Sequence, residues 1–311
     1  MGNELVEEAP MKYFCTLSDK NYACQGIALL RSLRRYANDF VLYYLCLDGE
    51  TRDMVERLGG SDVVTMSIEE FEKADPQVTD CRGQKVDDKF HMGFTSYSQF
   101  CYAMTPFWTN FVLNHLPENI EWFAYLDSDL FFRQPLEPVF QTMGTKSVGI
   151  FRHRHLDNTC PSGEFNVGMV VFRNDETGKK CAAWWREVMR NPNNQWAGKY
   201  GTCGDQKYLE MFIPLFGDSR VAILDDFIGH GAPWNYSLYQ YDGDFIIWKG
   251  KRQLLVFNHF SHFIPDFDHG TYKEAKGKEW GQCIVSPQVR KWYDEYFTEV
   301  KGVRDDLRRG V

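Results

Sequence analysis

The sequence lacks the features of secreted, membrane-spanning and extended proteins. Residues 1–10 are acidic and polar with no apolar stretch, so we expect an N-terminal extension that is not a signal peptide. Val6 does not fit the N-myristoylation pattern that Gly2 would otherwise suggest. There is no repeat, low-complexity tract or Gly/Ser linker. With 43% hydrophobic and 25% charged residues, the composition excludes disordered, collagen-like and coiled-coil proteins.

The chain also lacks a plausible membrane span and any paired-cysteine motif. Residues 91–117 contain no Asp, Glu, Lys or Arg, but they are rich in Ser, Thr, Gln and Asn, so we expect a buried helix broken at Pro106. The nine cysteines are odd in number, form no CxxC motif, and several lie in apolar runs. These features predict reduced thiols in a cytoplasmic protein, with peripheral contact as the only expected association with a membrane.

An excess of positive charge is missing as well. Lys and Arg number 35 against 43 Asp and Glu, which gives a net charge of −8. Such a protein has no broad positive field for nucleic acid, so we expect no nucleic-acid partner. An anionic ligand would therefore need a local positive charge, for instance from a metal ion.

Strands and helices alternate through the first 70 residues. Apolar runs at 11–17, 40–47 and 63–66 predict strands, and the segments between them, 21–36 and 51–58, have helical periodicity. This order predicts parallel strands with right-handed crossovers in an open α/β sheet.

The rest of the chain predicts a mixed second half within one compact domain. Further strands are expected at 122–126, 147–151, 165–172 and 221–224, with a hairpin at 245–248 and 254–257. Further helices are expected at 97–116, 181–190, 204–212 and 289–300, the last followed by a frayed, charged tail at 301–311.

The strongest chemical signal is a pair of carboxylates after a buried strand, in the run AYLDSDLFF at 124–132. Asp127 and Asp129 are two residues apart, so in extended backbone they face the same side. Ligands of open α/β sheets bind at this end of the strands, and two carboxylates suit Mg²⁺ or Mn²⁺. Without further support, the pair is equally an acidic turn.

Two histidines in the run VFNHFSHF, His259 and His262, follow a second apolar strand. An imidazole added to two carboxylates would make a ligand set that favours Mn²⁺. A single histidine is more often a core or surface residue than a ligand, so the proposal depends on the Asp pair.

Several segments in order resemble the nucleotide-diphospho-sugar transferases of the GT-A fold. They are FCTLSDKNYACQGIALLRSL, YLDSDLFF, FNVGMVVFRND, CGDQKYL, APWNY and LVFNHFSHF, which together span roughly residues 11–265. The chain is similar to bacterial transferases of polysaccharide assembly and, more distantly, to the retaining glycogenin and lipopolysaccharide galactosyltransferase family. The resemblance implies a Rossmann-like open mixed sheet flanked by helices in a single domain at 11–300, with a nucleotide-binding half at 11–130 and an acceptor-binding half at 131–300.

The resemblance also implies roles for particular residues. The metal ligands would be Asp127, Asp129 and His259, with Asp127 also touching the ribose. The base and ribose would be bound by the loop after the first strand, with Thr16, Asp19, Asn21 and Tyr22. The donor sugar and the chemistry would involve Asn166, Asp205 and Gln206, and the acceptor side would include Trp234 and Asn235.

One block departs from the family. In the related galactosyltransferases, the histidine that matches His259 is followed by a Gly and then by a Lys that contacts the diphosphate. Here His262 stands at the Gly position, and the next lysine is Lys273. The diphosphate contact would therefore fall to His262 or be absent from this loop.

These observations predict a Mn²⁺- or Mg²⁺-dependent glycosyltransferase that moves a sugar from a nucleotide-diphosphate sugar, by likeness a UDP-hexose, to a saccharide or lipid-linked glycan. Retention is favoured by the resemblance. Inversion would need a general base, for which Asp205 is the motif-borne candidate, unless Asp205 merely caps a helix.

Two alternatives remain. One is a sugar- or nucleotide-sugar-binding protein on an inactive transferase fold, and the other is a phosphohydrolase with Asp127 as nucleophile and Asp129 as acid. The basic segment FRHRH, 151–155, is interpreted as a solvated loop, with a grip on a lipid-linked phosphate as the minor possibility.

Overall fold

A seven-stranded sheet forms the centre of the computed structural model, which describes residues 11–37, 39–83, 96–155, 163–191, 195, 204–275 and 284–310. Its strand order is β3-β2-β1-β4-β7-β6-β8, and only β7 runs against its neighbours. The strands are β1 (Lys12–Ser18), β2 (Phe40–Cys46), β3 (Val63–Ser67), β4 (Trp122–Leu126), β6 (Val148–Arg152), β7 (Phe165–Arg173) and β8 (Val221–Ile223). The expected parallel order of the first three strands is confirmed.

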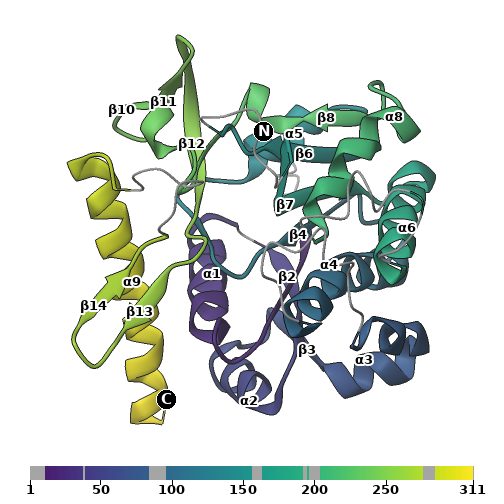
Figure 1. Cartoon of the computed structure of the whole chain (residues 1–311), viewed down its shortest axis with the longest axis horizontal. Coiled ribbons are helices and arrows are strands. Elements are labelled where there is room, and N and C mark those ends of the chain that lie inside the picture. Colours follow the sequence, from purple (N-terminus) through teal and green to yellow (C-terminus); the bar gives the residue numbers. More distant parts are fainter. Residues whose placement is uncertain are drawn as a thin grey trace, which may run out of the picture.

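Helices cover both faces of this sheet (Figure 1). One face carries α1 (Ala23–Tyr36), α2 (Gly49–Leu58) and α5 (Glu137–Met143). The other carries α3 (Ile68–Ala74), α4 (Ser96–His115), α6 (Glu176–Arg190) and α8 (Phe212–Phe216), with the 3-10 turns η1 (Pro76–Cys81) and η4 (Gln206–Met211). Adjacent residues of β1 show the division, because Phe14 packs into the first layer and Cys15 into the second.

A second sheet joins the C-terminal third of the chain to the end of β4. Its strands are β10 (Gln240–Asp242), β11 (Phe245–Trp248), β12 (Lys251–His259) and β5 (Leu130–Phe132), in that order, with β9 (Gly229–Gly231) also paired to β12. The predicted hairpin is confirmed as β11 and β12. The sequence pattern did not reveal β5, because three apolar residues directly after Asp129 are too short for a periodic signal.

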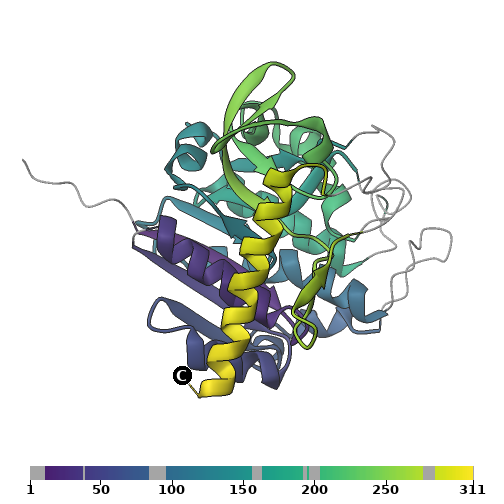
Figure 2. The ribbon, with the colours of Figure 1, turned by 90° about the vertical axis from the view of Figure 1, so that its left-hand side faces the viewer.

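The C-terminal helix α9 (Pro287–Arg309) lies across α1, as Figure 2 shows. The expectation of a frayed tail after residue 300 is wrong. Arg31 on α1 pairs with Asp306 at 2.5 Å, which holds the last turns in place, and Gly310 ends the helix in the left-handed conformation. The small hairpin β13 (Ile264–Asp266) and β14 (Thr271–Lys273) packs beside this helix.

The expected break at Pro106 is also absent. Helix α4 continues through this proline, with Met104, Phe107 and Trp108 buried around it. Proline removes one N–H donor from the helix, but tertiary packing on both sides keeps the helical path. The uncharged segment is therefore a core helix.

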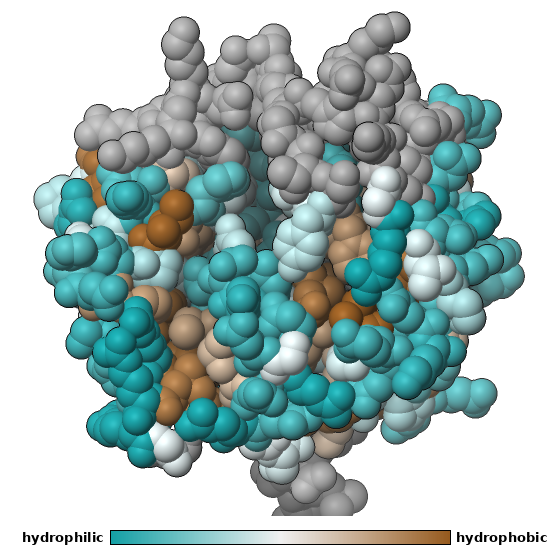
Figure 3. Space-filling view, turned by 60° about the horizontal axis from the view of Figure 1, so that its bottom comes forward, coloured by the Kyte–Doolittle hydropathy of each residue, from teal (hydrophilic) through white to brown (hydrophobic). Residues whose placement is uncertain are grey.

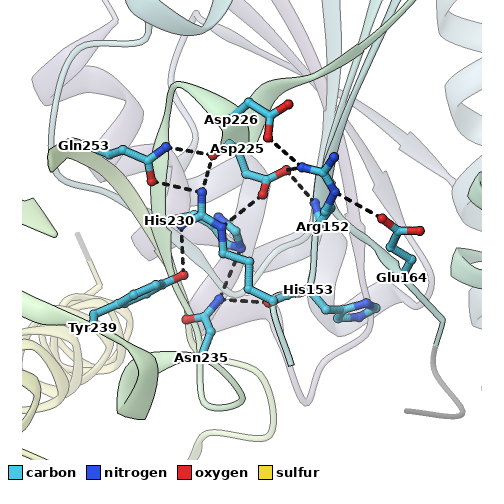
Figure 4. Close-up of polar contacts among 10 residues, drawn as sticks. Arg152, His153, Glu164, Asp225, Asp226, His230, Asn235, Tyr239 and Gln253 are labelled. Carbon is cyan, nitrogen blue, oxygen red and sulfur yellow. Dashed lines mark hydrogen bonds and ion pairs between the residues drawn. The ribbon is translucent and has the colours of Figure 1, made fainter. Parts of the chain in front are cut away.

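The interpretation of FRHRH as a solvated loop is wrong. Arg154 and Asp225 form an ion pair at 3.0 Å, with both side chains fully buried. Arg154 also donates to Gln253 and Tyr239, which Figure 4 labels together with Asp225. Its guanidinium lies 3.9 Å from the ring centroid of Trp248. Arg154 has a φ of 57°, a left-handed conformation that costs a non-glycine residue about 1–3 kcal/mol and that this network offsets. The segment is a buried junction between the two sheets.

The surface shows no extended apolar band on the face in Figure 3, where hydrophilic residues separate the apolar groups. Among the described residues, no helix combines the length and hydropathy that a membrane crossing requires. Six of the nine cysteines lie in the described part of the chain, and all six are free thiols.

The buried Arg154–Asp225 pair predicts a large stability difference between two aspartates. Replacing Asp225 with Ala should lower the free energy of unfolding by about 3–5 kcal/mol, because it leaves a buried guanidinium unpaired. The matched control is Asp242→Ala, which removes the half-exposed partner of Arg252 and should cost less than about 1 kcal/mol. Urea denaturation of both variants measures the difference, and equal losses would contradict the prediction.

Candidate active site

A polar cavity of about 550 Å³ opens at the carboxyl ends of β1 and β4. Because β7 runs antiparallel, its first residues reach the same edge. The described residues that line it include Asp19, Asn21, Tyr22, Tyr97, Thr105, Tyr125, Asp127, Asp129, His153, Asn166, Asp205, Gln206, Trp234, His259 and His262. No Lys or Arg is among the described lining residues, so these residues offer an anionic ligand no permanently charged side chain.

The pairing of β5 with β12 brings His259 to the carboxylates. Leu130, directly after Asp129, is in register with His259, and the Phe260 amide donates to the Asp129 carbonyl at 3.0 Å. His259 Nε2 lies 3.0 Å from Asp129 Oδ1 and 3.6 Å from Asp127 Oδ2. One ligand atom from each of the three residues lies within 4.8 Å of the others. Two carboxylates and one imidazole in this arrangement fit a divalent cation such as Mn²⁺.

Asn166 fixes the direction in which His259 points. The Asn166 Oδ1 atom accepts from the Gly168 amide at 2.7 Å and faces His259 Nδ1 at 3.1 Å. Since this oxygen can only accept, Nδ1 carries a proton and Nε2 points towards Asp127 and Asp129. Nε2 can donate to a carboxylate when protonated, and its lone pair would be available to a cation. Asn166 therefore contacts a backbone amide and also orients a candidate metal ligand.

The pKa values of the three candidate ligands shift in a concerted way. Burial raises the pKa of Asp127 to about 6, and the Asp129 charge adds to this effect. Burial alone would raise the pKa of Asp129, but the contact with His259 lowers it below its usual value. Burial likewise opposes the charged form of His259, yet the two carboxylates raise its pKa. The cluster thus concentrates negative charge where a cation would relieve it.

Asp205 lies in the same cavity, where the charged form of its carboxyl group is disfavoured. Burial raises its pKa well above the usual value, and the charge of Asp127 adds to the shift. A hydroxyl chain lies between these two carboxyl groups, because Thr105 contacts Asp205 and donates to Tyr125, which donates to Asp127 Oδ1 at 2.8 Å. Asp205 precedes η4, but its side chain makes no capping hydrogen bond, so the helix-cap interpretation is not supported.

The loop after β1 forms the other end of the cavity. The carboxylate of Asp19 accepts from the Asn21 side chain at 2.9 Å and from the Tyr97 hydroxyl at 3.1 Å. Tyr22 lines the cavity beside them, whereas Thr16 is fully buried in β1 and is not a lining residue. The expected group is therefore together except for Thr16.

The remaining expected residues fall into two classes. Gln206, Trp234 and His262 line the cavity, and His262 is exposed with a φ of 58°. Asn235 is fully buried, and its amide donates to the His153 carbonyl at 3.0 Å, so it supports the cavity wall from behind. Lys273 lies on the β13–β14 hairpin and is absent from the lining residues.

The lining residues that the sequence interpretation missed include His153, Tyr97, Thr105 and Tyr125. Tyr125 was detectable, because it lies two residues before Asp127 and so faces the same side of β4. Only the coincidence of a strand end and FRHRH could have indicated His153. A larger hollow of about 800 Å³ between α1, β5 and α9 is lined by charges that pair with one another, such as Arg133 with Glu295, and has no comparable chemistry.

Sequence comparison finds relatives without a described function. No protein-family model matches the chain. The uncharacterised protein YfnF of Bacillus subtilis (strain 168) is 28% identical over 268 residues, which cover 80% of this chain and 81% of YfnF. The uncharacterised protein YfnD of the same organism is 24% identical over 298 residues, or 91% of this chain and 90% of YfnD.

Structural comparison identifies the fold. Mouse xyloside xylosyltransferase 1, in its apo form, aligns with a TM-score of 0.53 at 14% identity, over 81% of this chain and 98% of its own. The galactosyltransferase LgtC, in complex with donor and acceptor sugar analogues, aligns with a TM-score of 0.53 at 15% identity, over 93% and 95% of the two chains. The chain has the GT-A fold of these glycosyltransferases, which confirms the fold expected from the sequence blocks.

The close approach of Asn166 and His259 predicts that position 168 requires glycine. A Cβ atom on Gly168 would lie 2.6 Å from both Asn166 Oδ1 and His259 Nδ1, so Gly168→Ala must displace one of them. Partners of this kind typically change metal affinity 10–100-fold, and we expect Mn²⁺ to bind at least about tenfold more weakly, measured by calorimetry.

The control is Gly49→Ala at the start of α2, where a Cβ would meet no atom within 4 Å. Both variants should keep the far-ultraviolet circular dichroism of the wild type. Unchanged Mn²⁺ affinity in Gly168→Ala would show that the Asn166–His259 contact does not orient the imidazole.

Proposed function

We propose that this protein is a metal-dependent glycosyltransferase that moves a hexose from a UDP-sugar to a saccharide or lipid-linked glycan acceptor. The observation that carries the proposal is the convergence of Asp127, Asp129 and His259 inside a polar cavity of a GT-A fold. These residues would hold Mn²⁺ or Mg²⁺, which as a Lewis acid would neutralise the charge that grows on the leaving diphosphate.

The two ends of the cavity would bind different parts of the substrates. Asp19 and Asn21, already linked by a hydrogen bond, would bind the nucleoside through their polar edges, with Tyr22 and Tyr97 beside them. At the other end, Gln206 would lie beside the donor sugar and Trp234 would contribute an apolar face to the acceptor side. The described lining offers no lysine or arginine for the diphosphate, which is why the metal site is central to the proposal.

Transfer with retention fits the cavity better than inversion. An inverting enzyme needs a carboxylate base beside the acceptor hydroxyl. The described lining contains four carboxyl groups, those of Asp19, Asp127, Asp129 and Asp205. The first is engaged at the nucleoside end, the next two belong to the metal set, and burial raises the pKa of Asp205, which disfavours its carboxylate form. This leaves no well-suited carboxylate base in the described lining.

The non-enzymatic alternative, a nucleotide-sugar-binding protein on the same fold, shares every binding feature and differs only in turnover. The phosphohydrolase alternative would need Asp127 free to attack, whereas it is held by Tyr125 and faces His259. A cytoplasmic location is part of our proposal, and the free thiols of the six described cysteines are consistent with it.

Removing one carboxylate tests the metal requirement. Asp129→Asn keeps the shape of the side chain but removes its charge, so metal-dependent turnover should fall on the order of 100-fold or more while the protein stays folded. Release of nucleoside diphosphate is measured over a panel of UDP-, GDP- and dTDP-sugars, with Mn²⁺ or with chelator.

The matched control is Asp242→Asn on the exposed strand β10, which should match the wild type. Full activity of Asp129→Asn would refute the metal site. Metal-dependent binding of a nucleotide sugar without any turnover would favour the binding protein, and phosphate release from an aryl phosphate would favour the hydrolase.

Asp205 provides the test of stereochemistry. If this carboxyl group is neutral in the folded protein, Asp205→Asn changes little charge and turnover should stay within about tenfold of the wild type. A general base would lose on the order of 100-fold or more. The anomeric configuration of the product, read by nuclear magnetic resonance, should match that of the donor, and an inverted product would overturn retention.

A further inference from the structure

A buried histidine in the cavity wall, His153, has no part in the proposed metal set. It lies at the junction of β6 and the turn at Arg154, and its side chain lines the cavity. Figure 4 shows its ring leaving the backbone on the side away from Asp225 and Gln253. The junction thus anchors the backbone on one side and presents the imidazole on the other.

The imidazole is held in one orientation and one protonation state. Its backbone amide donates to the Glu164 carbonyl at 2.8 Å, and its carbonyl accepts from Asn235 at 3.0 Å. The ring Nδ1 donates to the Gly163 carbonyl at 2.9 Å, so Nε2 carries the lone pair. Burial lowers the pKa of His153 to about 3, which agrees with a neutral ring that accepts a hydrogen bond at Nε2.

Two groups lie 3.2 Å from Nε2, the Asn166 Nδ2 atom and the Gln206 Oε1 atom. Because an amide oxygen cannot donate to a lone pair, the donor at Nε2 is Asn166. The Asn166 Nδ2 atom lies 3.2 Å from His153 Nε2 and 3.3 Å from Gln206 Oε1, and its two hydrogens serve these two acceptors. On its other end, Asn166 Oδ1 accepts from Gly168 and His259. All four hydrogen-bonding positions of this buried amide are therefore filled, and each has a definite direction.

We propose that His153 is a positioning residue that fixes the amide of Asn166, so that Asn166 links the metal ligand His259 to the sugar-facing residue Gln206. Without an acceptor at His153 Nε2, one hydrogen of Asn166 Nδ2 is left unsatisfied and the amide can turn over. A turned amide would present a donor to His259 Nδ1, which is already a donor. It would also release Gln206. The role in catalysis rests on the proposed transferase function, but the effect on metal binding does not.

Two substitutions separate hydrogen bonding from packing. His153→Phe keeps a ring against Trp234 and His155 but has no acceptor. His153→Gln loses the ring but can place a carbonyl oxygen near the position of Nε2. If His153 acts through its hydrogen bond, Mn²⁺ affinity without nucleotide should fall about 10-fold in the Phe variant and recover to within about threefold in the Gln variant. The turnover number should follow the same order, with KM for the donor changing less.

A control variant and a fallback variant complete the test. His155→Phe, on the neighbouring ring that does not line the cavity, should bind Mn²⁺ within about threefold of the wild type. If His153→Phe does not fold, His153→Leu replaces it: this side chain also lacks an acceptor for Asn166 Nδ2, and Mn²⁺ affinity should fall by a similar factor.

Equal or better Mn²⁺ binding by the Phe variant than by the Gln variant would overturn the inference and leave His153 as a packing residue. Wild-type protein that binds Mn²⁺ but turns over no nucleotide sugar would instead count against the proposed function, while the order of Mn²⁺ affinities would still decide the role of His153.

Discussion

The pairing of β5 with β12 is the constraint on which the candidate site depends. It joins Leu130 to His259 across more than a hundred residues of chain, and it does so one residue beyond Asp129. Side chains alternate along a strand, so a slip of one residue would turn His259 to the opposite face and remove the imidazole from the carboxylates. The same pairing lets β5 pack on α1, and Phe131 contacts Tyr296 of α9, so the C-terminal helix stabilises the site from behind.

A site of this kind is unfavourable for the folded chain in the absence of a cation. Asp129 and Asp205 are buried and Asp127 is partly buried beside them, in a protein that already carries a net charge of −8. The pKa values of Asp205 and Asp127 are both raised, so proton uptake by either group would relieve part of this repulsion. Packing around the site holds these residues in place. The buried Arg154–Asp225 pair fixes the neighbouring turn, and α9 packs against the second sheet. A divalent cation would relieve the repulsion among these carboxylates, and this relief would strengthen its binding.

How much could be predicted from the sequence depended on the range of the interactions. The parallel strands of the first half carry local apolar runs, and their order followed from them. Asp127 and Asp129 were predicted because a strand end and a two-residue spacing are local features, whereas pairing them with His259 needed a resemblance. FRHRH was misinterpreted because composition indicates solvent exposure for a basic run, and only the fold reveals a buried Asp225 some seventy residues away. The prediction of a frayed tail at the end of α9 was wrong for the same reason, because Arg31, from the other end of the chain, stabilises these turns.

The hydrogen bonds around Asn166 explain why FNVG is a structural unit and not simply a strand. Asn166 needs a donor on one side and acceptors on the other, and Gly168 leaves room for its oxygen and for His259 at once. Each contact of this amide comes from a different element: β7 itself, the end of β12, the turn after β6 and the start of η4. The hydrogen bonds of Asn166 can therefore all form only when both sheets are in their native arrangement. Because the same amide touches His259 and Gln206, the geometry of the metal site and that of the sugar-facing wall cannot be set independently.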